Sequence, residues 1–486
     1  MGVTEKIFKD PVHGYIALPA DWCRDFVDTP VFQRLRHIEQ TSMRVLYPAA
    51  HHDRFIHSLG TYHLGRRLFD LLCKQAKQEV KDELCQYRTT FLIACLMHDC
   101  GHAPFSHTCE KFYNYNREKG SASEKPVYQR LKEVYTEDFE VGGSFNPKEH
   151  EAFSAIILKQ CYGAIIDEKY KNNVDLELAA RMITGCTYPD ETAPSTSIKN
   201  CLIGLLNGTA IDVDKLDYIL RDTWASGVQN TTVDIDRLLA AARLHHGDDG
   251  RWTLCFSGAA LSVLQTVLNA RNYLYEWIYG HHTVLYYSKL LERAVCALAE
   301  KLSPPKTELF WETVFSEKPF LSKQKLSKKY ADFSIYLPTD GDVLYLLKHF
   351  QDGIKDAKEY LEHRPTRFAL WKTSAEFRSL FEGHAMLSDP KKCDSIGKRI
   401  PMLFKENFSA VCKDKDDVIV TPGTFKPSRF DEGDISILMD NRPVPLTRLL
   451  RGLTPASAEY TFYVFVPVGA RTEKSKMIDL IRKQKR

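Results

Sequence analysis

The chain has 486 residues, and its 66 basic and 63 acidic side chains leave a formal net charge of only +3. Hydrophobic and charged fractions of 44% and 27% are those of an ordinary soluble globular protein, and so small a charge does not by itself indicate nucleic-acid binding. No apolar run approaches the roughly 20 residues of a membrane-spanning helix, and the first residues lack a signal-peptide pattern. The 13 cysteines are odd in number without framework spacing, which predicts reduced thiols and a cytoplasmic protein, or a nuclear one in a eukaryote.

Apolar residues at helical spacing dominate the first 300 residues. They predict helices over residues 29–40, 58–73, 84–98, 150–160, 198–206 and 261–301. Pro30 marks the start of the first helix, and Gly101 and Pro104 predict a turn over residues 101–107 after the third. Asp212 is the predicted N-cap of a further helix. Residues 120–146 are polar and are expected to form a surface excursion.

The composition changes after Pro304-Pro305, where short helical and strand-like pieces alternate with Lys-rich loops. Aromatic and β-branched residues predict a strand over residues 458–468, and residues 471–486 form a basic tail, which we interpret as a solvated helix face. We therefore predict a mainly α protein, with a helical core over residues 1–303 and a smaller α+β region over 304–486. An oligomerisation or regulatory role is expected for the second region.

Four candidate metal ligands stand in distinctive local contexts: His57, His98, Asp99 and Asp214. Imidazole and carboxylate together suit cations such as Zn, Fe or Mn. Such an ion polarises a phosphoryl oxygen and lowers the pKa of a bound water to about 7, which points to metal-assisted hydrolysis of a phosphate ester. The main alternative is a zinc site that uses Cys95, Cys100 and Cys109, but their spacing matches no paired Cys motif, and we interpret them as core residues.

Further titratable residues follow the His-Asp doublet. His102 and His107 lie on the predicted turn, where they either cap it or contact phosphate and protonate a leaving oxygen; we favour the second role. Glu110 is spaced to orient the His107 ring. The pair His150-Glu151 carries a weaker signal of the same kind.

One face of the helix after Asp212 combines charged and aromatic groups. Asp214, Tyr218 and Asp222 are spaced i, i+4, i+8 and share that face, and Lys215 lies beside them. A polyphosphate site needs several cations, Arg especially, and Arg54 and Arg271 are the other candidates. Tyr218 and Tyr279 are either core aromatics or rings that pack on a sugar or base.

These residues resemble the HD-domain superfamily of metal-dependent phosphohydrolases. More narrowly, they are similar to the dNTP triphosphohydrolases, in the branch of the bacterial dGTP triphosphohydrolases and the SAM-domain-bearing vertebrate dNTPase. The resemblance runs from about residue 6 to 289, and no SAM domain is expected before it. The matching motifs are KDPVHG at 9–14, DTPVFQRLRHIEQ at 28–40, RFIHSLG at 54–60, HDCGHAPFSH at 98–107, IDVDKLDYILRD at 211–222 and ARN at 270–272.

The resemblance implies water attack at the α-phosphorus, which yields a deoxynucleoside and inorganic triphosphate, with Mn, Fe, Zn or Mg as cofactor. The implied metal ligands are His57, His98, Asp99 and Asp214. The implied catalytic residues are His107 with Glu110, His102, His150 and Glu151. The implied substrate contacts are Gln40 at the sugar 3′-hydroxyl, Arg54, Lys215 and Arg271 at the triphosphate, Tyr218 and Asp222 at sugar and phosphate, and Tyr279 under the sugar.

The regulated branch of this family assembles when activator nucleotides bind, so the resemblance implies an activator and a homotetramer or dimer. The implied activator-site residues are Lys6, Ile7, Asp28, Gln33, Arg36 and Arg237. Ser257 and Ala259 stand where further basic residues of that site are expected, which leaves the activator open. His281 matches a residue near the activator pocket. Thr41 replaces a Leu beside the sugar, so base and sugar selectivity do not carry over.

Three other functions remain open at this point. They are an HD-type phosphodiesterase on cyclic or monophosphate nucleotides, a non-catalytic nucleotide sensor, and, with support only from the basic tail, a nuclease. Substitution of Arg54 or Lys215 would impair a phosphodiesterase less than a triphosphatase, because a phosphodiesterase needs fewer cations. A sensor would bind dNTPs without turnover. The biological role, control of the dNTP pool or dNTP depletion against viruses or phages, uses the same chemistry in either case.

Overall fold

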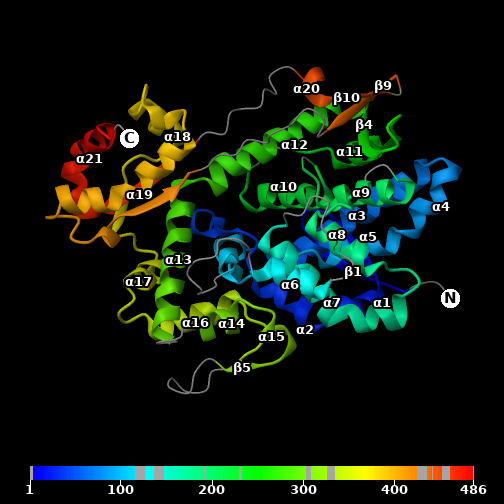
Figure 1. The fold of residues 1–486 in the computed structure, drawn as a ribbon, viewed down its shortest axis with the longest axis horizontal. Coiled ribbons are helices and arrows are strands. Elements are labelled where there is room, and N and C mark those ends of the chain that lie inside the picture. Colours follow the sequence, from blue (N-terminus) through cyan, green and yellow to red (C-terminus); the bar gives the residue numbers. More distant parts are fainter. Residues whose placement is uncertain are drawn as a thin grey trace.

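The computed structural model describes residues 4–114, 126–135, 139, 147–190, 193–209, 211–228, 232–302, 308–325, 334–423, 435–440, 442–450 and 460–484. The described chain is mainly helical, with small sheets at its margins (Figure 1). Within these residues no helix combines the length and the apolar character needed to cross a bilayer. The mainly α fold class is therefore confirmed.

The chain begins with a hairpin that the sequence analysis did not predict. Strands β1 (Glu5–Asp10) and β2 (Gly14–Pro19) pair antiparallel, and Gly14 closes the turn with a φ of 78°, a conformation that favours glycine. The short helices α1 (Ala20–Trp22) and α2 (Pro30–Gln33) follow.

The predicted helix over residues 29–40 is wrong in its second half. After α2 the chain tightens into a 3₁₀ turn, Arg34–His37, and Ile38 is extended. Glu39 forms a bridge with Asp53, and the Gln40 amide donates to the carbonyl of His52 at 3.1 Å. These pairings hold residues 38–40 in extended form and place Gln40 beside the next helix.

A bundle of helices forms the centre of the molecule. It comprises α3 (Arg54–Gln75), α4 (Gln78–Gln86), α5 (Arg88–Met97), α6 (Pro126–Val134), α7 (Glu149–Ile165), α8 (Leu176–Thr184), α9 (Pro194–Leu206), α10 (Val213–Ala225), α11 (Ile235–Ala241), α12 (Leu261–Tyr273) and α13 (His282–Leu302). Asp53 caps α3 through the Ile56 amide, and Asp212 caps α10 through the Lys215 amide, as predicted for Asp212. Helix α3 packs on α5 and α10, which brings the segments with the candidate ligands together.

Three predicted elements differ in detail. The helix over 84–98 is divided at Tyr87 between α4 and α5. The helix over 261–301 is interrupted by a π-helical stretch, Leu274–Tyr279, and by Gly280, where a Cβ would lie 2.7 Å from the Tyr275 carbonyl. Part of the expected surface excursion over 120–146 lies outside the described residues, and the rest forms α6, which buries Leu131 in the core.

The C-terminal part contributes to two cores. Helices α14 (Glu308–Val314), α15 (Lys318–Leu321), α16 (Asp340–Phe350) and α17 (Lys355–Glu362) follow α13, with the short strands β5 (Gln324–Lys325) and β6 (Ser334–Ile335) between them. Buried residues from Phe310 to Ala357 share the main core with the first 302 residues. A second core is centred on the sheet β7-β11-β8 and receives Tyr286, Tyr287 and Leu290 from α13. The predicted boundary near 303 stays a prediction, and this packing favours one closer to residue 360.

The sheet of the second core consists of β7 (Arg367–Ala369), β8 (Ile419–Pro422) and β11 (Phe462–Pro467), all antiparallel. The predicted strand over 458–468 thus begins later, and residues 458–459 lie outside the described chain. Helices α18 (Ser374–Leu380), α19 (Pro390–Asn407) and α21 (Lys474–Arg482) belong to the same lobe. The basic tail forms α21, whose Met477, Ile478 and Ile481 are buried in the second core.

A four-stranded sheet joins distant parts of the chain. Strands β3 (Ala242–His246) and β4 (Trp252–Ser257) form a hairpin, and β9 (Ser436–Met439) and β10 (Arg442–Pro445) extend it, followed by α20 (Leu446–Leu449). The C-terminal part therefore returns to the helical bundle at this sheet (Figure 1).

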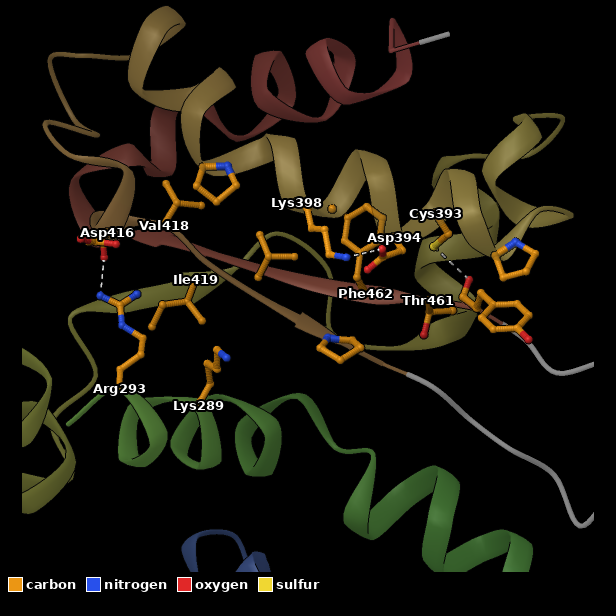
Figure 2. Close-up of a pocket in the computed structure, with 16 residues that line it drawn as sticks. Lys289, Arg293, Cys393, Asp394, Lys398, Asp416, Val418, Ile419, Thr461 and Phe462 are labelled. Atoms are coloured by element: carbon orange, nitrogen blue, oxygen red, sulfur yellow. Dashed lines mark hydrogen bonds and ion pairs between the residues drawn. The ribbon is translucent and has the colours of Figure 1, made fainter. Parts of the chain in front are cut away.

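A cavity of about 640 Å³ lies between α13, α19, β8 and β11 (Figure 2). Its floor is apolar, with Val418, Ile419 and Phe462. The cations at its margin are already paired within the chain: Lys289 with Glu292, Arg293 with Asp356, and Lys398 with Asp394.

Candidate metal centre and histidine cluster

The four predicted metal ligands converge in the structure. His57 comes from α3, His98 and Asp99 follow α5, and Asp214 lies in the first turn of α10. The Nε2 atom of His57 is 3.2 Å from Nε2 of His98, 3.0 Å from Asp214 Oδ1 and 3.6 Å from Asp99 Oδ2. Donor atoms from three separate segments thus surround one point, and His57, His98 and Asp99 are buried.

The ring contacts fit a divalent cation. Nδ1 of His57 lies 2.7 Å from Asp217 Oδ2, and Nδ1 of His98 lies 2.9 Å from the Cys95 carbonyl. When each Nδ1–H donates to its acceptor, both Nε2 atoms carry lone pairs that face each other across 3.2 Å. A cation between them and the two carboxylates removes this repulsion, and the Nδ1 contacts orient the rings for it.

The electrostatic environment supports the same conclusion. Burial lowers the pKa of His57, but hydrogen bonds to Asp214 and Asp217 outweigh it and raise the pKa to about 10. Burial raises the pKa of Asp99, but Arg54 and the neighbouring imidazoles hold that pKa well below its usual range. The negative potential that draws a proton onto His57 also attracts a metal ion.

Sequence reasoning missed Asp217 and the network behind it. Asp217 accepts from Arg221 at 2.8 and 2.9 Å and lies 2.6 Å from Nε2 of His13, while Arg221 also donates to Asp10 at 2.8 Å. Burial raises the pKa of Asp217, yet Arg221, His13 and His57 hold it well below its usual range. The signal was present in the sequence, since Asp217 lies three residues after Asp214 and four before Arg221 on one helix.

A glycine permits this network. A Cβ at Gly60 of α3 would lie 1.9 Å from Asp217 Oδ1 and 2.5 Å from an Arg221 nitrogen. No side chain fits in that space, so glycine at this position allows α10 to present Asp217 directly to His57.

Arg54, a predicted triphosphate contact, is buried beside the metal ligands. Its guanidinium donates to Asp99 at 2.6 Å, to Ser106 Oγ at 2.8 Å and to the Gln40 carbonyl at 3.1 Å. Arg54 therefore orients a metal ligand and two loops. A guanidinium has five N–H groups, so donors remain for the predicted phosphate contact.

Three histidines form a second cluster next to the metal site. The rings of His102 and His150 stack at 4.4 Å, and His107 lies 4.9 and 5.1 Å from them. Glu110 joins the cluster, with Oε2 2.8 Å from His107 Nδ1 and Oε1 2.5 Å from His150 Nδ1. The predicted His107–Glu110 pair is thus in contact, and the His107 side chain is 59% exposed.

The pKa values of the histidines in this cluster are shifted in different directions. Burial lowers the pKa of His102 well below its usual value, and neither of its ring nitrogens has a hydrogen-bond partner in the described part of the chain. Burial also lowers the pKa of His150, but Glu110 outweighs it and raises that pKa. A stacked imidazole whose pKa is lowered therefore lies against one whose pKa is raised by Glu110, an arrangement suited to binding an anion and moving a proton.

Glu151 does not join this cluster directly. Its carboxylate accepts from the Lys148 amide at 2.7 Å and pairs with the Lys148 ammonium at 2.9 Å, which caps α7. Lys215 is similarly engaged, because its ammonium contacts Asp212 and donates to the Gly208 carbonyl at 2.8 Å. The predicted roles of both residues stay predictions.

The predicted sugar contacts take part in a separate set of interactions that involves α10 and the residues around Tyr279. Asp222 lies 2.6 Å from Nε2 of His52, a residue that sequence reasoning missed, and accepts from the Tyr279 hydroxyl. Gln40 is buried, and its Oε1 has no partner among the residues described. Tyr218 lies close to Tyr275, over which the Arg271 guanidinium stacks at 4.4 Å.

The predicted activator residues lie at the start of the chain and on α11. Lys6 pairs with Asp28 at 3.2 Å, Arg36 donates to Gln33 at 2.8 Å, and Ile7 is exposed. Arg237 lies on α11, where it donates to the Ala259 carbonyl at 2.8 Å. Their binding role stays a prediction.

The alternative zinc site is not supported. Cys95, Cys100 and Cys109 are buried, and burial raises their pKa values, which opposes the thiolate form that zinc requires. The groups of potential metal ligands found in the described chain contain only histidine and aspartate.

Comparison with known proteins agrees with this geometry. Residues 54–186 match the model of the HD domain, and this segment contains His57, His98 and Asp99. The uncharacterized protein YwfO of Bacillus subtilis is 27% identical over 60% of this chain and 56% of its own length. The deoxynucleoside triphosphate triphosphohydrolase SAMHD1 homolog of Dictyostelium discoideum is 30% identical over 57% of this chain and 46% of its own. The chain thus spans about half the length of these relatives.

Two solved structures share the fold. A hypothetical protein from Aquifex aeolicus has a TM-score of 0.64 at 19% identity, over 98% of this chain and 100% of its own. A phosphohydrolase from Bacteroides thetaiotaomicron has a TM-score of 0.64 at 20% identity, over 96% and 100%. The two structures show the shared fold, while the sequence matches show that the chain contains an HD domain and is related, over 57% of its length, to the SAMHD1 deoxynucleoside triphosphate triphosphohydrolases.

Proposed function

We propose that this protein is a divalent-metal-dependent phosphohydrolase that converts deoxynucleoside triphosphates into deoxynucleosides and inorganic triphosphate. The observation that carries the proposal is the convergence of His57, His98, Asp99 and Asp214 beside a histidine cluster organised by Glu110. The substrate class rests on the relatives named as deoxynucleoside triphosphate triphosphohydrolases.

The proposed position of the phosphate ester is between the two clusters. When bound, a divalent cation polarises a phosphoryl oxygen and acidifies a water molecule. His102, neutral and without a hydrogen-bond partner in the described chain, offers a donor to a phosphate oxygen. His107 contacts Glu110 through Nδ1, which leaves Nε2 as the proposed atom that passes a proton to the leaving 5′ oxygen.

The far side of the site suits a deoxyribose. The buried Oε1 of Gln40 is an acceptor that a 3′-hydroxyl would satisfy, and leaving it unpaired is costly. Tyr279, fixed by Asp222, supplies a flat surface for the sugar. Arg271 and the remaining donors of Arg54 are the proposed cations for the triphosphate.

We also propose nucleotide activation and a homo-oligomer, either a tetramer or a dimer. The support is the contact of Lys6 with Asp28, the contact of Arg36 with Gln33 and the exposure of Ile7, on residues that match the activator site of the related family. In a cell, such gating suits either control of the dNTP pool or dNTP depletion during infection.

The decisive experiment is product analysis. Purified protein is incubated with each dNTP, with Mn or Mg, and with and without a second nucleotide, and the products are separated by ion-exchange chromatography. Release of inorganic triphosphate and deoxynucleoside is expected. Release of monophosphates from cyclic nucleotides instead would favour a phosphodiesterase. Tight dNTP binding without turnover under every condition would refute the proposal and favour a sensor.

A further inference from the structure

A carboxylate from the C-terminal part joins two loops of the candidate site. Asp340, the first residue of α16, accepts the Phe105 amide on Oδ1 at 2.6 Å and the Glu39 amide on Oδ2 at 2.9 Å. Phe105 lies in the turn between His102 and His107, and Glu39 precedes Gln40. One buried side chain therefore contacts both the histidine turn and the loop with the predicted sugar contact.

The histidine turn needs such support because its backbone is strained. Phe105 has a φ of 59° and Ser106 a φ of 51°, both in the left-handed region that residues other than glycine rarely adopt. The Ser106 hydroxyl accepts from Arg54 at 2.8 Å and donates to the Glu39 carbonyl. Hydrogen bonds from outside the turn thus maintain a conformation that the turn alone does not favour.

A second contact fastens the same segment to the other end of the turn. The buried Arg34 donates to the Pro338 carbonyl at 2.7 Å and to the His102 carbonyl at 2.7 Å. Residues 338–340 and the turn are therefore held together at both His102 and Phe105. Beside them lies a cavity of about 620 Å³, lined by Glu39, Thr41, Phe105 and Asp340 among others, into which a released loop has room to move.

We propose that Asp340 is a positioning residue, which holds the His102–His107 turn and the Gln40 loop in register for catalysis. The inference rests on the proposed function. It assigns the start of α16, outside the matched HD domain, a direct part in shaping the site. An asparagine here retains only one acceptor and places an NH₂ group against a backbone N–H, so it releases one of the two loops.

Asp342 provides a matched control in the same turn of α16. Its carboxylate accepts from the Thr339 amide and hydroxyl, both at 2.7 Å, and so caps the helix. Asp342→Asn therefore removes a carboxylate and weakens α16, but leaves the contacts to Phe105 and Glu39 in place.

The test measures kcat, KM, metal content and thermal stability of Asp340→Asn, Asp340→Glu and Asp342→Asn. We expect Asp340→Asn to lower kcat by roughly 10- to 100-fold with unchanged metal content, because small misplacements of catalytic groups have effects of that size. Asp340→Glu, which retains two acceptor oxygens, should recover part of the activity. Equal kcat values for Asp340→Asn and Asp342→Asn would overturn the proposal.

Hydrogen exchange separates this inference from the proposed function. The Phe105 and Glu39 amides should exchange faster in Asp340→Asn than in the wild type, and no faster in Asp342→Asn. This readout needs no substrate. If the wild type hydrolyses no dNTP, the proposed function fails, but the exchange rates still test the positioning role of Asp340. Unchanged exchange in Asp340→Asn would refute that role even in an active enzyme.

Discussion

The metal centre and the histidine cluster are neighbours, but they are supported in opposite ways. In the metal centre a second contact fixes both imidazoles and one carboxylate: Asp217 orients His57, the Cys95 carbonyl orients His98, and Arg54 orients Asp99. In the histidine cluster Glu110 holds two rings, and the ring nitrogens of His102 have no hydrogen-bond partner within the described chain. The first arrangement suits a resident ion, and the second leaves nitrogens for groups that come and go.

The largest expected effect tests the resident ion. His98→Ala should reduce the bound metal to well below one ion per chain and activity by roughly 10³-fold or more, since metal catalysis supplies several kcal/mol. Elemental analysis and triphosphate release measure the two quantities. The control is His246→Ala, an exposed histidine on β3. If His98→Ala retained its full metal content, the account of this site as the centre that holds a resident ion would be wrong.

Glu110→Gln tests the role of the histidine cluster. Loss of the carboxylate that orients His107 and His150 should lower kcat by roughly 10²- to 10⁴-fold, the usual contribution of general acid–base catalysis, with metal content unchanged. Glu149→Gln, which alters a nearby carboxylate bonded to Asn114, should retain activity. If Glu110→Gln loses its metal, the two clusters are one unit and not two.

Asp217→Asn sharpens the comparison, because Asp217 orients the candidate ligand His57 and is not itself a candidate ligand. The amide donates poorly oriented hydrogens toward His57 and Arg221, and metal affinity should fall by roughly 10- to 100-fold, as for other residues that orient metal ligands. Metal titration followed by calorimetry gives the affinity. Asp236→Asn, on the exposed start of α11, should bind metal as the wild type does. An unchanged affinity in Asp217→Asn would contradict this account.

The smallest effect concerns pH. The pKa of Glu110 is lowered by His150 and His107 against the effect of burial, so its stabilisation exists above its ordinary pKa of 4.5 and is lost as pH falls. The pKa of His150 is raised by Glu110, so its stabilisation exists below 6.5 and is lost as pH rises through the folded value. Glu110→Gln should therefore reduce the free energy of unfolding by about 1–3 kcal/mol between pH 4.5 and 6.5, and less above. Urea unfolding across pH measures this; a pH-independent difference would contradict the ion pair.

The four candidate ligands that converge in the structure could be identified from the sequence, because each lies in a short motif whose residue types already suggest coordination; that they bind a metal stays a prediction. Asp217, His52 and Asp340 were not identified, because their roles depend on which distant atoms they meet. Asp340 lies 235 residues from Phe105, the residue whose amide it accepts. A local pattern does not contain the partner of such a contact.

In the fold too, elements with local sequence signals were predicted, and elements that depend on distant contacts were not. Apolar faces predicted α3 and α7, although α3 begins four residues before the predicted start, and the Asp212 cap predicted the start of α10, because these signals are local. The helix over 29–40 was overextended because pairing with residues 52–53 outweighs local helix propensity after His37. The β1–β2 hairpin was missed because it lies on the bundle with one face exposed and has few strongly β-forming residues.

Gly60 provides a way to weaken metal binding without altering any group proposed to contact metal or substrate. Because its missing side chain sets the separation of α3 and α10, even one methyl group there would displace Asp217. An alanine at this position should therefore weaken metal binding and give a low-activity variant for cellular experiments, with every candidate ligand still chemically intact.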